Sequence, residues 1–188
     1  MSIQSFYLKH FKQDMSLFGI EINGSIERRS NTLFAIYEIA GDLSKIIVPD
    51  KKIMPSRKYN LWEHTCFELF IAIKDLPKYW EFNFSPSGDW NVFYFETYRN
   101  EGFGNKLYEE GSFISLPFIS QRGPEKLIVK IEFDLNVIVR NNEKLYIGIS
   151  AVVEFRNYGL SYWALKHCEN KPNFHTRESF IISLAKNI

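Results

Sequence analysis

Two stretches of the sequence, residues 61–99 and 160–177, gather aromatic rings together with hydrogen-bonding side chains. A flat ring can stack on the apolar C–H face of a pyranose, and the sugar hydroxyls then need amide, carboxylate or guanidinium partners. Glu68, Asn83 and Arg99 supply such partners in the first stretch. The pattern therefore favours a site for a small, hydroxyl-rich ligand. The rings available for stacking are Trp62, Trp90, Tyr94, Tyr98 and Trp163.

The second stretch adds histidine and arginine side chains, which we expect to join the same pocket. No residue is assigned a catalytic or metal-binding role. Packing in the core is the competing role for any single ring, because large aromatic side chains commonly fill the interior of a β-sandwich. The predicted ligand-binding residues are His64, Glu68, Asn83, Ser85, Trp90, Tyr98, Arg99, Trp163, His167, His175 and Arg177.

Three histidines suggest a metal or haem site as one alternative. Imidazole is a common metal ligand, and Cys66 or a glutamate would complete the set. The spacing of His167 and His175 matches no ligand signature, however, and His64 lies far away in the sequence. We therefore expect no cofactor, neither calcium nor haem.

A second alternative is an enzyme with a site centred on Cys66 and histidine. His64 and Cys66 are two residues apart, and side chains at that spacing share one face of a strand. The Ser85-Pro86-Ser87-Gly88 segment lacks the glycine pattern of a nucleophile elbow. Glu68 and Glu81 would be the carboxylates of a glycosidase, but two carboxylates without a known separation are a weak signal.

Composition narrows the class of protein that carries these residues. The 188 residues are 45% hydrophobic, 24% charged and 16% aromatic, with a formal net charge of +1. Such a balance argues against disorder and against a chain selected to coat nucleic acid. The first residues include Lys9, His10 and Lys12, so no signal-peptide core is present, and no apolar run is long enough for a membrane helix. We expect a cytoplasmic protein with two reduced cysteines.

Short β-rich runs separated by turn signals follow one another along the chain, without intervening helical patterns. This arrangement predicts an all-β fold, a two-sheet antiparallel sandwich of immunoglobulin-like or jelly-roll-like type. Residues 67–73 are apolar on both faces except at Glu68, which predicts a central strand with one buried, partnered carboxylate. The expected strands are Gly24–Arg29, Thr32–Ala40, Cys66–Ile73, Tyr79–Ser85, Trp90–Tyr98, Ser112–Ile119, Lys126–Asp134, Lys144–Phe155, Leu160–Lys166 and Ser179–Leu184.

Three blocks of sequence resemble the DOMON-like superfamily, which includes the family-nine carbohydrate-binding modules and haem-binding DOMON domains. The first block runs from Leu61 through Glu68 to Ile71, and the second from Tyr79 through the Pro86-Ser87-Gly88 turn. Residues 160–180, with Trp163 and His167, look like an uncharacterised bacterial subgroup. The resemblance covers most of the chain.

The resemblance implies a β-sandwich that binds a ligand on one concave face or at one end. His64-Thr65-Cys66 and Asn83 stand where members commonly carry acidic residues, and fewer hard oxygen ligands disfavour calcium. We predict a single DOMON-like domain over residues 1–188 that binds a saccharide or sugar-containing small molecule without catalysis. We expect no nucleic-acid or membrane partner. A pure interaction module with an exposed sheet edge is the remaining alternative.

Overall fold

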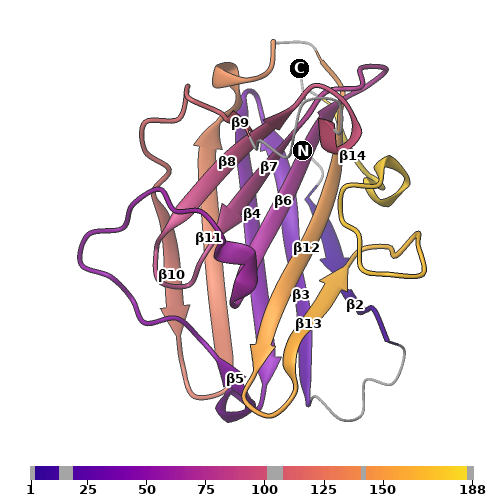
Figure 1. Cartoon of the computed structure of the whole chain (residues 1–188). Coiled ribbons are helices and arrows are strands. Elements are labelled where there is room, and N and C mark those ends of the chain that lie inside the picture. Colours follow the sequence, from indigo (N-terminus) through magenta and orange to yellow (C-terminus); the bar gives the residue numbers. More distant parts are fainter. Residues whose placement is uncertain (1–2, 13–18, 101–107, 141–142, 186–188) are drawn as a thin grey trace.

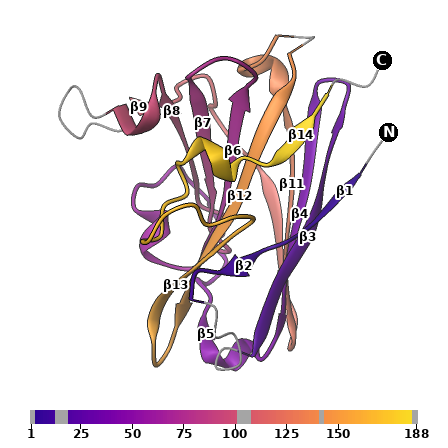
Figure 2. The same ribbon diagram turned by 90° about the vertical axis from the view of Figure 1, so that its right-hand side faces the viewer.

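The computed structural model describes residues 3–12, 19–100, 108–140 and 143–185. Its strands form two antiparallel sheets that face each other, and short 3-10 turns are the helical segments in these residues (Figures 1 and 2). The predicted all-β, two-sheet sandwich is thereby confirmed.

The first sheet, here sheet A, has the strand order β1-β3-β4-β11-β10. Its outward-facing side chains alternate with buried ones along β4 and β11, so this sheet contributes one face to the core. The bounds are β1 Gln4–Tyr7, β3 Ile20–Arg29, β4 Thr32–Gly41, β10 Phe118–Arg122 and β11 Lys126–Asp134.

The second sheet, here sheet B, has the order β2-β13-β12-β6-β7-β8-β9, and β5 and β14 also pair with β12. Its central strands β6 and β7 are buried along their whole length, so both faces of sheet B are covered there. The bounds are β2 Lys9–His10, β5 Ile46–Ile47, β6 Cys66–Ile73, β7 Tyr79–Phe84, β8 Trp90–Phe95, β9 Tyr108–Glu109, β12 Leu145–Phe155, β13 Gly159–Ala164 and β14 Ile182–Leu184.

Most strands lie where the sequence predicts them. The predictions for β6 and β11 agree with the structure to the residue. The run Ser112–Ile119 is wrong for most of its length, because the strand β10 begins at Phe118. Strands β1, β2, β5 and β9 are not predicted, since two to four residues carry too little alternation. The turn signals at 102–105 and 141–142 lie outside the described residues.

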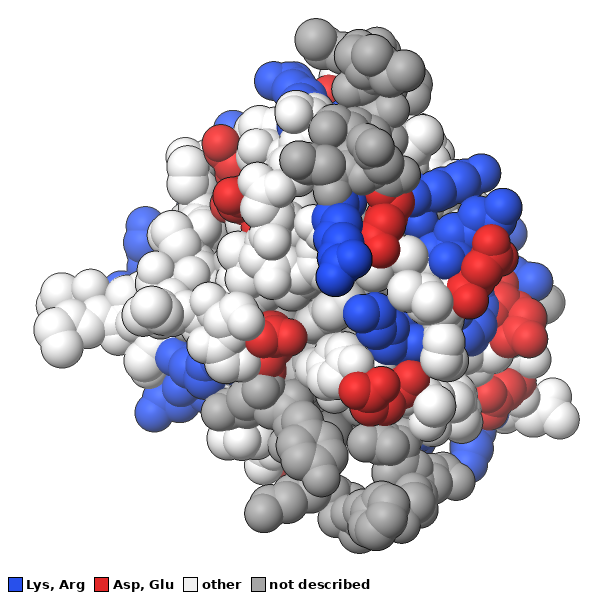
Figure 3. Space-filling model, turned by 90° about the horizontal axis from the view of Figure 1, so that it is seen from above, with Lys and Arg blue, Asp and Glu red and all other residues white. Residues whose placement is uncertain are grey.

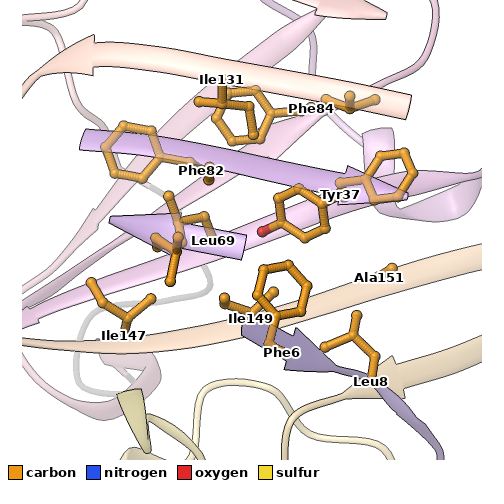
Figure 4. Packing of buried hydrophobic residues seen from close by; sticks show 14 of the residues in the cluster. Phe6, Leu8, Tyr37, Leu69, Phe82, Phe84, Ile131, Ile147, Ile149 and Ala151 are labelled. Carbon is orange, nitrogen blue, oxygen red and sulfur yellow. The ribbon is translucent and has the colours of Figure 1, made fainter. Parts of the chain in front are cut away.

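The main core fills the space between the two sheets (Figure 4). Phe82 stacks on Phe133 of the opposite sheet with ring centroids 4.7 Å apart, and Tyr37 packs against Phe6 and Phe67. Each such ring contributes roughly 1.5–3 kcal/mol by leaving water. The inward-facing positions of β6 and β7 are thus used for packing, which leaves their other face for chemistry.

A second apolar cluster covers one end of the outer face of sheet B, on the side away from sheet A (Figure 2). Phe70, Tyr79 and Phe180 belong to it, so the C-terminal segment lies across β6 and β7. Gly148 on β12 makes this contact close: a Cβ there would lie 2.5 Å from Cδ1 of Phe180. The outer face is therefore partly roofed by a segment from the far end of the chain.

The surface charge is mixed at the end of the sandwich seen in Figure 3, where basic and acidic side chains lie next to one another. This agrees with the near-neutral composition of the chain. Within the described residues, no helix has the length and apolar character needed to cross a membrane.

Candidate functional site

Four polar side chains line up across the outer face of sheet B, and we call them the polar row. Ser150 of β12 pairs with Glu68 of β6, which pairs with Asn83 of β7, which pairs with Asn91 of β8. Residues in register on neighbouring strands point to the same face of a sheet. All four are buried, with exposed fractions of 1%, 3%, 0% and 0% in that order.

Hydrogen bonds connect the polar row to Glu81, two residues before Asn83 on the same face. The Asn83 amide donates from Nδ2 to Glu81 Oε1 at 2.8 Å, and the Ser150 hydroxyl donates to Glu68 Oε2 at 2.9 Å. The Cys66 thiol lies 3.7 Å from Asn83 Oδ1. The predicted partner of the buried Glu68 is therefore a hydroxyl rather than a basic group.

The carboxyl groups of Glu68 and Glu81 have raised pKa values. Burial is the main cause for Glu68, and the nearby Glu81 carboxyl raises its pKa further, while the Ser150 bond lowers it. Burial also raises the pKa of Glu81, against the Asn83 hydrogen bond and the charge of Arg99. Two neighbouring carboxyls that titrate together hold their last proton as a pair.

A histidine corner lies beside Glu81. The Tyr79 hydroxyl and His175 Nδ1 are 2.9 Å apart, and His175 Nε2 lies 3.6 Å from Glu81 Oε2. Burial, with a contribution from Arg99, lowers the pKa of His175 to about 3. The imidazole is thus neutral at physiological pH, and Nδ1 accepts the Tyr79 hydroxyl proton.

The same corner is closed by Arg99 and Asn173. The guanidinium of Arg99 donates to Asn173 Oδ1 at 3.2 Å, and Asn173 Nδ2 donates to the Tyr98 hydroxyl at 2.5 Å. Arg99 has a positive φ of 47°, and its backbone N–H donates to the Tyr79 hydroxyl. A left-handed conformation at a non-glycine residue persists where surrounding contacts hold it, as they do here.

An aromatic ring borders the polar row on the opposite side. Trp62 lies on the 3-10 turn η2, Leu61–Glu63, which contacts β6 and β7. Its indole is partly buried and packs edge-on against Phe93, with ring centroids 5.8 Å apart. The outer face therefore combines an indole, an amide and two carboxyls, which is the set of groups that saccharide recognition needs.

Comparison with known proteins bears on the fold. No protein-family model matches the chain, and no curated protein matches it in sequence. A solved structure of a candidate carbohydrate-binding protein from Bacteroides uniformis aligns with a TM-score of 0.69 and 11% identity over 98% of this chain and 87% of that one.

A family 9 carbohydrate-binding module from Caldicellulosiruptor kristjanssonii aligns in two solved structures, one with glucose and one with cellotriose. Both have a TM-score of 0.57 and 9% identity over 98% of this chain, and they cover 84% and 82% of the module. The chain has the fold of this module. At these identities the likeness establishes the fold alone, and the DOMON-like resemblance stays a prediction.

The structure brings some of the predicted site residues together. Glu68 and Asn83 are neighbours in the polar row, and His175 joins them through Glu81. Arg99 and Tyr98 lie at the edge of the same region through Asn173.

The structure places other predicted residues elsewhere. Trp90 and Trp163 pack in the main core between the sheets, so neither ring offers a face to a ligand. Ser85 lies in the β7–β8 turn, where its hydroxyl accepts from the Ser87 hydroxyl and backbone N–H. These three have the structural role that competes with ligand contact. Tyr94, a further stacking candidate, packs against the main core beside Trp80.

The remaining predicted residues lie at separate positions on the surface of the sandwich. The His64 imidazole is exposed and lies 2.9 Å from Glu154 Oε2. His167 bonds the Lys9 carbonyl, and Arg177 donates to the carbonyls of Ile73 and Leu76. The three histidines therefore do not meet, and the described residues contain no group of three or more His, Cys, Asp or Glu side chains arranged for a metal.

Cys66 bears on the enzyme alternative. Its thiol is fully buried, and burial together with Glu68 raises its pKa well above the ordinary value. The thiolate is the reactive form, so a buried thiol held protonated is a poor nucleophile.

Ser150, Asn91, Tyr79 and Asn173 belong to the site but are absent from the sequence prediction. Ser150 and Asn91 are single polar residues within apolar runs, and only the register of β12 and β8 brings them into the polar row. The alternation of Tyr79, Glu81 and Asn83 was the available signal for the first strand face.

Proposed function

We propose that this chain binds a saccharide on the outer face of sheet B and catalyses no reaction on it. The observation that supports the proposal is the polar row itself. Burying an amide and two carboxyls in an apolar face costs free energy, and the same positions filled by apolar residues would pack the sandwich better. A row kept at that cost is suited to a ligand.

Each group has a role in the proposed complex. The free acceptor atoms of Glu68 and Glu81 accept sugar hydroxyl protons, and the Asn83 amide both donates and accepts. The Trp62 indole lies next to these groups and supplies an apolar surface for the C–H face of a pyranose. The solved relatives in fold carry glucose and cellotriose, which makes these two sugars the first probes.

Calorimetric titration with glucose and cellotriose tests this function. We expect binding in the micromolar to millimolar range, and Trp62→Ala weakens it at least tenfold because the stacking surface is lost. Tyr7→Ala is the matched control, since that aromatic side chain is exposed on β1 of the other sheet. A folded protein that binds no mono- or disaccharide at millimolar concentration contradicts the proposal.

A further inference from the structure

The polar groups on the outer face of sheet B are unequally divided between hydrogen-bond donors and acceptors. Glu68 Oε2 accepts from Ser150, but Glu68 Oε1 has no partner among the described residues. Glu81 Oε2 has its nearest polar neighbour at 3.6 Å, a neutral imidazole nitrogen. Two carboxyl oxygens of deeply buried side chains are therefore free to accept.

The donors nearby are mostly occupied. The Ser150 hydroxyl is committed to Glu68 and the Tyr79 hydroxyl to His175. The Asn83 amide spends one of its protons on Glu81. A ligand at this face meets spare acceptors and few spare donors, so it must bring the donors itself.

Basic side chains do not compensate the two carboxyls. Arg57 donates to Asn91 Oδ1 and to the carbonyls of Glu110 and Phe113, and Arg99 donates to Asn173. In the described part of the chain, no lysine or arginine forms an ion pair with Glu68 or Glu81. The raised pKa values of both carboxyls, described above, are what an uncompensated pair produces.

We propose that Glu68 and Glu81 make this face select saccharides by charge, so that it prefers an amino sugar with a free ammonium group and rejects a uronic acid. The inference rests on the saccharide-binding function proposed above. An ammonium group brings three donors and a positive charge to two spare acceptors, whereas a carboxylate brings only acceptors and a like charge. A neutral sugar lies between them.

Titration calorimetry with glucosamine, glucose and glucuronic acid at neutral pH tests the selectivity. We expect glucosamine to bind at least tenfold tighter than glucose, and glucuronic acid to bind at least tenfold more weakly than glucose. Glu81→Gln and Glu68→Gln, made separately, each reduce the ratio of glucosamine to glucose affinity at least fivefold. Glu38→Gln on the outer face of sheet A is the matched control and leaves the ratio unchanged.

Each outcome decides between the two proposals, provided that circular dichroism and thermal melting show the variants to be folded. Glucose binding without a preference for glucosamine overturns the charge selectivity and leaves the saccharide function standing. A preference that survives both glutamine substitutions also overturns it. A folded protein that binds none of the three sugars overturns both.

Discussion

Asp89 and Glu68 are two carboxylates that are buried almost equally, with exposed fractions of 4% and 3%. Asp89, in the turn between β7 and β8, bonds Lys52 and the backbone N–H of Ser56. Burial raises its pKa, but these bonds and the Ser87 hydroxyl outweigh burial, and the net pKa is lowered. The pKa of Glu68 is raised instead.

The difference lies in the partners and not in the depth of burial. Every interaction of Asp89 favours its charged form, so the charge stabilises the turn. Glu68 has one hydroxyl partner and a second carboxyl beside it, so its charge costs free energy. The turn uses its carboxylate for folding, whereas the polar row keeps one whose acceptor capacity is unused. This contrast separates a structural acid from one available to a ligand.

Removal of the Asp89 carboxylate breaks the comparison on its structural side and has the largest expected effect. Asp89→Ala leaves Lys52 and the Ser56 N–H without their acceptor, and we expect a loss of about 2 kcal/mol in the free energy of unfolding. Urea denaturation at neutral pH measures it. If Asp89→Ala is as stable as the native chain, the turn does not depend on this carboxylate.

The pH dependence of stability sharpens the comparison on the side of the polar row. The folded-state pKa of Glu68 and of Glu81 lies above the ordinary value of 4.5, so the folded chain binds more protons than the unfolded chain as pH rises past that value. The stability that these protonated groups contribute is full below about pH 4.5 and is lost as pH rises through the folded pKa values. We expect the native chain to lose roughly 1–2 kcal/mol between about pH 5 and about pH 8.

The double variant Glu68→Gln/Glu81→Gln is the control for this profile, because glutamine cannot ionise. Its stability should stay level over the same interval and should exceed that of the native chain at the alkaline end. Asp89 contributes in the opposite direction, since its lowered pKa gives stability that is lost only as pH falls below the ordinary aspartate value. A double variant whose profile parallels the native one shows that the pair is not the source.

The fold could be predicted from sequence because alternation and turn signals are local properties of the chain. Lys126–Asp134 alternates without interruption, and the Pro86–Asp89 segment forms the turn that its residues indicate. The weak cases are strands of two to four residues, which form because a neighbouring strand offers free backbone groups. That information lies elsewhere in the chain.

The candidate site was predicted only in part, because it depends on register between strands. Glu68 was identified from a single acidic residue in an apolar run, and its neighbour Asn83 from the alternation of β7. Ser150 lies 82 residues away in sequence, and its contact with Glu68 follows from the pairing of β12 with β6. Trp90 was misleading because an aromatic residue beside polar ones has the same sequence pattern whether its ring packs inward or outward.

The smallest expected effect concerns the single hydrogen bond to Glu68. Ser150→Ala removes a hydroxyl that lowers the pKa of Glu68, so this pKa rises further and the charged form becomes costlier. We expect a loss of about 1 kcal/mol at about pH 8 and a smaller loss at about pH 5, where Glu68 is protonated. Denaturation at the two pH values gives the difference.

Ser161→Ala is the matched control for that measurement. Its hydroxyl is also buried in sheet B, but it accepts from Trp163 Nε1 and donates to the Val153 carbonyl, and neither partner titrates in this range. The loss on Ser161→Ala should therefore be the same at both pH values. If Ser150→Ala behaves identically, the hydroxyl does not sense the charge of Glu68, and the polar row is then as indifferent to that charge as any neutral network in the core.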